Sequence, residues 1–401
     1  MIMEVQSAIL NNLKYQKRNK KEMFTKPKIF NLIENFISTR ELICYGGTAI
    51  NAHLPNNKKI YEYMDIPDYD CYSSNAIEDA KQLSNILAKY SENVEVKSAM
   101  NKGTYKIFIN FISIVDFTQM NNDIFINLHK KSIKIDGLLY APPNYLKISL
   151  YQELSRPLGD ISRWEKISER LALLNETHPL YVQNAKTPEK TLPDTSEYIT
   201  INKFIINQIK LNNWVVFGDF GLHYYLKFCP KKYMNKSNKL KTPYILVDNL
   251  NDVLNKLNFN SDYSIKHYSY KITNDFYQII YKDHPILYIF ITDSCQSYNT
   301  YNGLNIASID TILCIYYALS FIDIPFVNKH IILSYCYLLH NIKIKSGICR
   351  RFHMPCIGTQ QTYEHIRKLR DTKYHIYKKT GSTKLFKNYF FQYKPKTQKI
   401  Y

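Results

Sequence analysis

Three aspartates have the spacing of a carboxylate cluster. Asp68 and Asp70 are one residue apart in Asp68–Ser73, a stretch that alternates like a strand. Residues i and i+2 of a strand point to the same face, so this spacing predicts two carboxylates side by side. Asp116, near the end of the apolar stretch Phe111–Thr118, predicts a third carboxylate from a neighbouring strand. Carboxylate oxygens are the ligands that Mg²⁺ and Mn²⁺ prefer, and three can hold two ions that activate a hydroxyl and stabilise leaving pyrophosphate.

A glycine pair precedes the aspartates. Gly46 and Gly47 follow the short apolar stretch Glu41–Tyr45 and begin the helical segment Thr48–Leu54. Glycine lets the backbone approach a phosphate closely, and the N-terminus of a helix favours an anion. The pair therefore predicts a triphosphate loop, with an ordinary turn as the alternative.

The elements that would position these residues alternate between helix and strand, which predicts an α/β fold. Asn75 and Glu78 have the spacing of a capping box at the start of a helix. Periodicity predicts helices at 28–40, 75–90, 144–155 and 162–174, and strands at 41–45, 68–73, 92–99, 104–110 and 111–118.

Composition limits the classes of protein that remain. The chain has 401 residues, enough for two to three domains, and 45% of them are apolar, which excludes a mainly disordered protein. The formal net charge of +19 predicts a polyanionic partner, either nucleic acid or an anionic membrane surface. The longest apolar stretches are far shorter than a membrane span, so we expect a soluble protein. Eight cysteines are sparse and lie mostly in apolar stretches, which predicts reduced core thiols rather than a disulfide scaffold.

Three short segments recur in order, after a Pro- and Thr-rich linker at 179–195. They predict a duplicated α/β module, with two unrelated α/β domains as the alternative. In this alignment Asp293 is the counterpart of Asp116, and no pair of acids replaces Asp68 and Asp70, so the second copy is predicted to be inactive. The matches are Tyr45–Leu54 with Phe217–Leu226, Ile112–Phe117 with Tyr288–Ser294, and Gly137-Leu138 with Gly303-Leu304.

The ordered combination of glycine pair, Asp-x-Asp and third Asp resembles the nucleotidyltransferase superfamily, whose fold is similar to the palm of DNA polymerase beta. Further motifs resemble the poly(A) polymerase catalytic subunits of large cytoplasmic DNA viruses such as poxviruses, asfarviruses and mimivirus-like viruses. The gap between Gly47 and Asp68 is longer than is usual in the superfamily, and the loop Pro55–Tyr63 would absorb the excess. The motifs are Gly46–Asn51, Ile66–Asp70, Gly103–Lys106 and Ser155–Lys166.

This resemblance implies an α/β (α+β) protein: a polymerase-beta-like nucleotidyltransferase domain, a second, degenerate nucleotidyltransferase-like domain and a basic C-terminal extension. We expect an N-terminal helical region at 1–40, the catalytic domain at 41–180, the degenerate domain at 196–345 and the extension at 346–401. The implied activity is template-independent addition of AMP from ATP to the 3′ end of viral mRNA by a two-metal-ion mechanism. The alternatives are another RNA nucleotidyltransferase, of the CCA-adding or terminal uridylyl type, and a non-catalytic RNA-binding processivity subunit.

The resemblance also implies roles for individual residues and partners. Asp68, Asp70 and Asp116 would be catalytic and would bind Mg²⁺ or Mn²⁺. The expected partners are ATP, the 3′ end of single-stranded RNA and a second copy of the chain, or else a separate processivity subunit, and no membrane. The expected location is the host cytoplasm, in the viral factory, or the virion. The residues expected to bind ATP are Gly46, Gly47, Thr48 and Lys147.

Two further groups allow several interpretations. Four basic residues near a predicted helix start would contact ATP phosphates or the RNA backbone, or would form a solvated face. The tail 350–401 interleaves cations with aromatic side chains, which suits single-stranded RNA, a dimer interface or a partly disordered segment. Cys349, His353 and Cys356 offer too few ligands for a convincing zinc site. The four basic residues are Arg156, Arg163, Lys166 and Arg170.

Overall fold

The chain forms two compact units in the computed structural model. The first unit comprises residues 1–146 and 364–401, and the second comprises residues 147–363. No helix among the described residues combines the length and the hydropathy needed to span a bilayer. Residues 1–26 of the expected N-terminal helical region and most of the linker at 179–195 lie outside the described residues, and the expected division into domains stays a prediction. The structure describes residues 27–61, 68–181, 192–226, 242–270, 275–324, 327–346 and 354–396.

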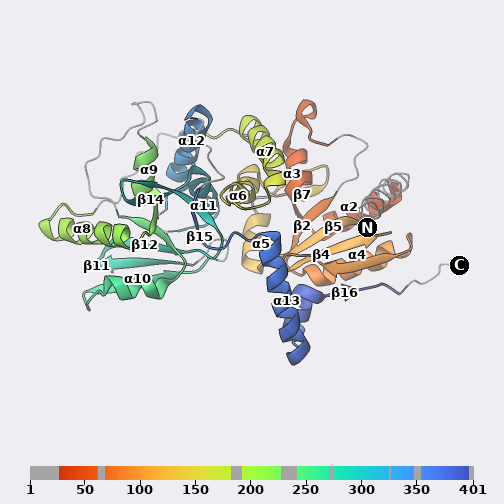
Figure 1. The fold of residues 1–401 in the computed structure, drawn as a ribbon. Coiled ribbons are helices and arrows are strands. Elements are labelled where there is room, and N and C mark those ends of the chain that lie inside the picture. The colour runs from red at the N-terminus through yellow and green to blue at the C-terminus, as the bar shows by residue number, and fades with distance from the viewer. Residues whose placement is uncertain are drawn as a thin grey trace, which may run out of the picture. The chain divides into compact units, whose positions relative to one another are not determined.

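The first unit is built on an eight-stranded mixed sheet with the strand order β16-β3-β4-β5-β2-β1-β7-β6 (Figure 1). Its strands are β1 (Ile43–Tyr45), β2 (Tyr69–Ser73), β3 (Val94–Ser98), β4 (Thr104–Ile109), β5 (Ile112–Gln119), β6 (Ile133–Ile135), β7 (Leu138–Tyr140) and β16 (Gln392–Tyr393). Its helices are α2 (Pro27–Thr39), α3 (Gly46–His53), α4 (Ala76–Leu87), α5 (Asn122–His129), α13 (Tyr363–Thr380) and the short α14 (Thr383–Leu385). Pro143–Leu154 forms α6, which crosses from the first unit into the second.

One face of the first sheet is buried and the other is more open. In β2, Tyr69, Cys71 and Ser73 are buried, whereas Asp70 and Tyr72 between them are half-buried. The helix α4 packs against β3, β4 and β5, and α2 packs against α4. The alternation read from the sequence therefore places the apolar residues of β2 under helices and Asp70 on the opposite face.

The start of α4 is capped differently from the prediction. The side chain of Asn75 makes no capping hydrogen bond, so the predicted capping box is wrong. Instead, the amide oxygen of Gln119, on β5, accepts from the backbone N–H of Ala76 over 3.0 Å. A partner 43 residues away satisfies this helix end, and a local motif gives no hint of it.

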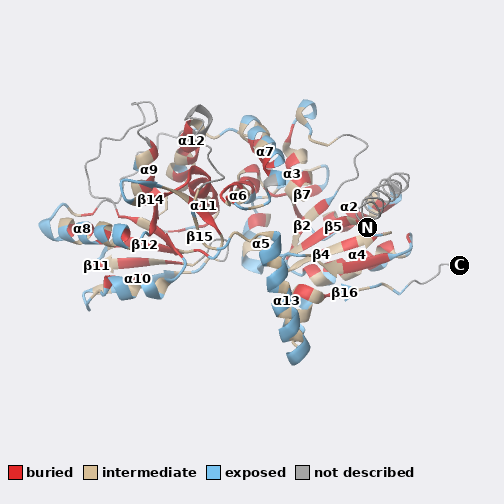
Figure 2. Cartoon of the chain, viewed as in Figure 1, coloured by how far each residue is buried: buried red, intermediate tan, exposed pale blue. Residues whose placement is uncertain are grey.

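The C-terminal segment packs along the edge of the first sheet. Its strand β16 pairs antiparallel with β3, and Phe391 just before it is buried. Arg370 of α13 donates to the backbone carbonyls of Ala99 and Tyr389. Apart from such anchors α13 is exposed along its length, and none of its residues is fully buried (Figure 2).

The second unit contains another eight-stranded sheet, with the order β10-β11-β12-β9-β8-β14-β13-β15. Its strands are β8 (Val215–Phe217), β9 (Tyr244–Val247), β10 (Tyr263–Tyr268), β11 (Phe276–Tyr281), β12 (His284–Ile291), β13 (Gln296–Tyr301), β14 (Leu304–Ala307) and β15 (Cys356–Ile357). Its helices are α7 (Trp164–Thr177), α8 (Ser196–Leu211), α9 (Gly218–Leu226), α10 (Leu250–Leu257), α11 (Ile309–Ser320) and α12 (Lys329–Ser346).

The two sheets repeat one topology, so the predicted duplication is confirmed. Seven strands, β3-β4-β5-β2-β1-β7-β6, correspond in order to β10-β11-β12-β9-β8-β14-β13. The local irregularities repeat as well. The bulge between Ile107 and Phe108 recurs between Ile279 and Ile280. Tight turns with positive φ at two successive residues recur at Asn110-Phe111 and Lys282-Asp283, and at Asp136-Gly137 and Asn302-Gly303.

Strand register corrects one part of the sequence alignment. Asp116 pairs with Asp70 across β5 and β2, and Tyr288 pairs with Tyr244 across the equivalent strands β12 and β9. The counterpart of Asp116 is therefore Tyr288. Asp293, which the alignment had chosen, lies beyond the end of β12 and is exposed.

The cysteines in the described part of the chain follow the prediction, apart from one disulfide. Cys44, Cys71, Cys314 and Cys336 are buried free thiols. Cys295 and Cys356 form a disulfide between β15 and the segment that leads into β13, which the sparse cysteine content did not predict. Cys349 and His353 lie outside the described residues, so only Cys356 of the disfavoured zinc trio is described, and it is disulfide-bonded.

Candidate active site

Asp70 and Asp116 occupy directly paired positions on the adjacent parallel strands β2 and β5. Paired residues of neighbouring strands project to the same face, so the two carboxylates share the more open face of the first sheet. Asp70 is half-buried and Asp116 is buried. The sequence predicted that Asp70 and Asp116 lie close together, and the pairing register of β2 and β5 is the physical cause.

The carboxylate of Asp116 is held at both oxygens. The ammonium of Lys106, on β4, binds Oδ2 of Asp116, and the hydroxyl of Ser113 donates to Oδ1 over 3.2 Å. Lys106 is itself the paired residue of Asp116 across β4 and β5. A row of three charged side chains, Asp70, Asp116 and Lys106, thus crosses three strands of one sheet face.

Asp68 lies just before β2 and is exposed. The hydroxyl of Thr48, in the first turn of α3, donates to the backbone carbonyl of Asp68 over 2.7 Å. Thr48, which we expected to bind ATP, therefore ties the residue that carries the first predicted carboxylate to the glycine turn. Among the described residues no three His, Cys, Asp or Glu side chains gather closely enough to form a metal site. Two members of the predicted three-carboxylate cluster are thus in register, and the third, Asp68, lies on the residue just before β2.

The glycine turn fits closely against Asp70. Gly46 has a φ of +69°, and a Cβ built on it would lie 2.2 Å from Oδ2 of Asp70. No residue with a side chain fits here without moving the carboxylate. Gly47 is buried at the start of α3, and Tyr45, the N-cap residue, makes no side-chain capping bond. Gly46 is therefore required by its contact with Asp70, a reason that the sequence did not reveal.

Tyr45 is a member of the site that the sequence did not single out. It is paired with Asp70 across β1 and β2, its ring stacks on Tyr72 with 3.9 Å between ring centroids, and its hydroxyl lies 2.7 Å from Oγ1 of Thr118. Burial, and then the negative charges of Asp70 and Asp116, raise the pKa of the Tyr45 phenol well above its usual range. Tyr45 thus remains a neutral phenol beside the two acids.

Lys147, which we expected to contact the triphosphate, is fully buried in α6. Its ammonium donates to the carbonyl of His178 over 3.1 Å and lies 5.6 Å from the ring centroid of Tyr317. Burial lowers the pKa of this ammonium to about 8. Its position gives no support to the expected phosphate contact.

Two of the basic residues near the start of α7 are only partly available. Arg163 lies 3.4 Å from Oε1 of Glu153. Burial lowers the pKa of Arg156, and its Nε is buried without a hydrogen-bond partner among the described residues. Their assignment to ATP, to RNA or to a solvated face stays open.

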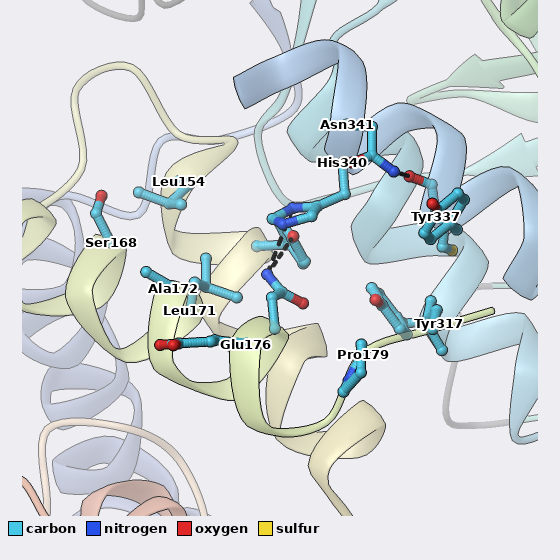
Figure 3. Close-up of a pocket in the computed structure, with 14 residues that line it drawn as sticks. Leu154, Ser168, Leu171, Ala172, Glu176, Pro179, Tyr317, Tyr337, His340 and Asn341 are labelled. Atoms are coloured by element: carbon cyan, nitrogen blue, oxygen red, sulfur yellow. Dashed lines mark hydrogen bonds between the residues drawn. The ribbon is translucent and has the colours of Figure 1, made fainter. Parts of the chain in front are cut away.

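A separate cavity of about 710 Å³ lies in the second unit among α6, α7, α11 and α12 (Figure 3). His340 points inward from α12, and its Nδ1 lies 3.4 Å from the side-chain amide of Asn175 on α7. The walls are mostly apolar, and the stacked rings of Tyr151 and Tyr317 form part of them. None of the predicted site residues lines this cavity.

At the equivalent positions the second unit carries no acids. Tyr244 stands where Asp70 stands in the first unit, and Tyr288 stands where Asp116 stands. Gly218 repeats Gly46 with a φ of +68°, but a Cβ on it would meet the ring of Tyr244 at 2.7 Å. The second unit therefore keeps the turn and the register and replaces the carboxylates with stacked aromatic rings.

The duplicated α/β fold corresponds to that of a protein of known structure. The chain superposes on the crystal structure of the Megavirus polyadenylate synthase with a TM-score of 0.77 and 21% identity, covering 98% of this chain and 85% of that one. This likeness confirms the predicted fold class.

The sequence comparisons lead to a particular family. Residues 31–160 match the family described as the poly(A) polymerase catalytic subunit, a segment that contains the glycine turn, the three aspartates and Lys106. A protein of Acanthamoeba polyphaga mimivirus, named as a poly(A) polymerase catalytic subunit, is 28% identical over 68% of this chain and 52% of its own length. A similarly named African swine fever virus protein is 28% identical over 43% of this chain and 38% of its own. The predicted resemblance to the poly(A) polymerase catalytic subunits of large DNA viruses is confirmed. The matched region spans about half of the length of the mimivirus relative and less than half of the African swine fever virus relative.

Proposed function

We propose that the protein is a polynucleotide adenylyltransferase that adds AMP from ATP to RNA 3′ ends without a template. The observation that carries the proposal is the paired position of Asp70 and Asp116 directly against the Gly46 turn. The matched family segment includes all of these residues. Two acids and a close glycine turn are what a nucleotidyl transfer requires, namely oxygen ligands for cations beside a site for phosphate.

The donor set fits Mg²⁺ or Mn²⁺. Asp70 and Asp116 would hold the cation with their carboxylate oxygens, and Asp68 would complete the set from the residue before β2. When bound, the divalent ions activate the attacking hydroxyl and neutralise the leaving pyrophosphate. Gly46 and Gly47 would accommodate the triphosphate at the start of α3, because glycine lets the backbone approach a phosphate closely and a helix N-terminus favours an anion.

In the proposed reaction the RNA 3′ hydroxyl attacks the α-phosphorus of ATP in line with the leaving group. A bond forms between the 3′ oxygen and that phosphorus, the bond to the bridging oxygen of the β-phosphate breaks, and pyrophosphate leaves. Asp116 accepts the proton of the hydroxyl, directly or through water. Ser113 keeps the Asp116 carboxylate oriented in this step through its bond to Oδ1.

The finer assignments rest on the resemblance alone. We propose a homodimer, with a separate processivity subunit as the alternative. We also propose a location in the viral factory of the host cytoplasm or in the virion. Single-stranded RNA is the proposed polyanion, in keeping with the net charge of +19.

The deciding experiment extends a labelled oligo(A) primer with full-length protein, Mg²⁺ and one nucleoside triphosphate at a time. Extension with ATP alone supports the proposal. Preferential extension with UTP or CTP indicates another RNA nucleotidyltransferase, and RNA binding without extension indicates a non-catalytic subunit. Asp293→Asn is the matched control, because this exposed aspartate lies outside the row of paired residues.

A further inference from the structure

The bond between Lys106 and Asp116 has a neutral equivalent in the second unit. Gln278 and Tyr288 occupy the equivalent paired positions on β11 and β12, and the amide of Gln278 donates to the hydroxyl of Tyr288 over 3.1 Å. Where the carboxylate is replaced by a phenol, the ammonium is replaced by an amide. The fold thus tolerates a neutral pair at these positions, so the lysine accompanies the acid and is not a requirement of the strand pairing.

The charges in the first unit explain this association. Asp70 and Asp116 are like charges on adjacent strands, and such a pair is unfavourable when both are ionised. The Asp116 side chain is only 9% exposed, so solvent screens it weakly, whereas the Lys106 side chain is 34% exposed. An ammonium on a flexible four-carbon stem can bind Asp116 and can also turn toward solvent without disturbing β4.

We propose that Lys106 is the counter-ion of the Asp70–Asp116 pair and competes with a divalent cation for Oδ2 of Asp116. Lys106 is then a positioning residue, which keeps the two acids together and yields its place when the cation binds. This inference rests on the proposed function, because nucleotidyl transfer is what requires the cation. The opposite role, a Lys106 that binds the triphosphate, makes a different prediction for cation binding.

The first test measures Mn²⁺ binding to the full-length protein by electron paramagnetic resonance, without nucleotide or RNA. Lys106→Met removes the competing charge, and we expect it to bind Mn²⁺ about tenfold more tightly than the wild type. Lys106→Arg keeps a cation and should retain the wild-type affinity. Lys97→Met is the matched control, since Lys97 lies on the next strand of the same face and binds Glu95 instead. Unchanged or weaker binding in Lys106→Met overturns the competition, as does a wild-type protein that binds no Mn²⁺.

The second test measures thermal unfolding in EDTA. Lys106→Met should unfold at a lower temperature than the wild type, and the difference should vanish in an Asp116→Asn background, where the carboxylate that Lys106 binds is gone. A variant that folds only when Asp116 is also neutralised shows the same coupling. Equal midpoints for Lys106→Met and the wild type in EDTA would exclude the counter-ion role.

These readouts separate the inference from the proposed function. If the wild type fails to extend a primer while both tests give the expected results, adenylyl transfer is wrong and the counter-ion assignment stands. If the wild type extends a primer with ATP while Lys106→Met binds Mn²⁺ like the wild type, the assignment to Lys106 is wrong and the activity stands.

Discussion

Tyr288 takes the place in the second sheet that Asp116 takes in the first. In the first sheet Asp116 pairs with Asp70 on β2, and in the second sheet Tyr288 pairs with Tyr244 on β9. Both β2 and β9 are the strands that follow the glycine turn of their unit. The rings of Tyr244 and Tyr288 stack with 4.4 Å between centroids, where the first unit has two carboxylates. Two aromatic rings cannot ligate a hard cation, so this substitution supports an inactive second copy.

We expect Asp70→Asn and Asp116→Asn each to abolish primer extension in full-length protein. Each change removes one anionic ligand and nearly preserves the shape of the side chain. RNA affinity in a filter-binding assay should stay within about threefold, because one uncharged side chain leaves the positive charge of the protein in place. A double variant that still extended oligo(A) would show that these two residues do not carry the reaction.

The two equivalent glycines give a matched pair of substitutions. Gly46→Ala forces the Asp70 carboxylate to move, so extension should be lost while the free energy of unfolding falls by about 1–2 kcal/mol for an alanine at positive φ. Gly218→Ala pushes against the Tyr244 ring, which cannot rotate away as a carboxylate can, so its stability loss should be larger.

Denaturant unfolding and primer extension below the unfolding temperature would measure both effects. A folded Gly218→Ala should extend primers like the wild type. Loss of extension in a stably folded Gly218→Ala would mean that the second unit takes part in the chemistry.

The sequence predicted the chemistry-bearing residues better than their partners. Asp68, Asp70 and the glycine pair are local patterns, because strand alternation and a helix start follow from neighbouring residues. Lys106 and Tyr45 enter the site only through strand pairing, which joins segments far apart in the chain. A single sequence does not reveal that register.

The features that the sequence did not reveal have the same origin. The alignment chose Asp293 as the counterpart of Asp116 because short apolar segments match at several offsets, and only pairing with β9 identifies Tyr288. The helix α6 was predicted, but not that packing would bury Lys147. The two-residue strand β16 pairs with β3 almost 300 residues earlier, and no local signal marks such a short strand.

The buried Lys147 predicts an unusual dependence of stability on pH. Burial lowers the pKa of this ammonium to about 8, below the value of 10.5 expected in the unfolded chain. Between these pH values the unfolded state binds more protons than the folded state, so this group makes stability rise with pH. Below pH 8 the full cost of keeping the charge buried is present, and it disappears as the pH approaches 10.5.

Lys147→Met should remove that contribution. The shift corresponds to about 3 kcal/mol, partly offset by the hydrogen bond to the His178 carbonyl that the variant lacks, so we expect a gain of about 1 kcal/mol in unfolding free energy at pH 7. The gain should shrink or reverse by pH 10. Because Lys147 is buried, the KM for ATP should not change. A large rise in KM with unchanged stability would instead assign Lys147 to the triphosphate, as the sequence predicted.

The exposed helix α13 is the part of the basic tail that we expect to contact RNA. Removing the residues from 378 onward is not a clean test, because it also removes β16 and the buried Phe391 from the first unit. Lys378→Gln/Lys379→Gln keeps the packing and removes two exposed cations at the end of α13. Lys203→Gln/Lys210→Gln on α8, also exposed, is the matched control with the same change of charge.

Binding of single-stranded RNA should weaken steeply with salt, because each phosphate neutralised by a cation releases counter-ions. The slope of log affinity against log salt should become shallower by about 0.7 for each phosphate that the α13 variant no longer neutralises, and should stay unchanged in the α8 variant. Extension products of the α13 variant should be shorter at equal times, because a weaker hold on the strand favours dissociation between additions. Fluorescence anisotropy at several salt concentrations and gel analysis of product length measure both effects. Equal slopes and equal product lengths for the two variants would place the RNA on another surface of the protein.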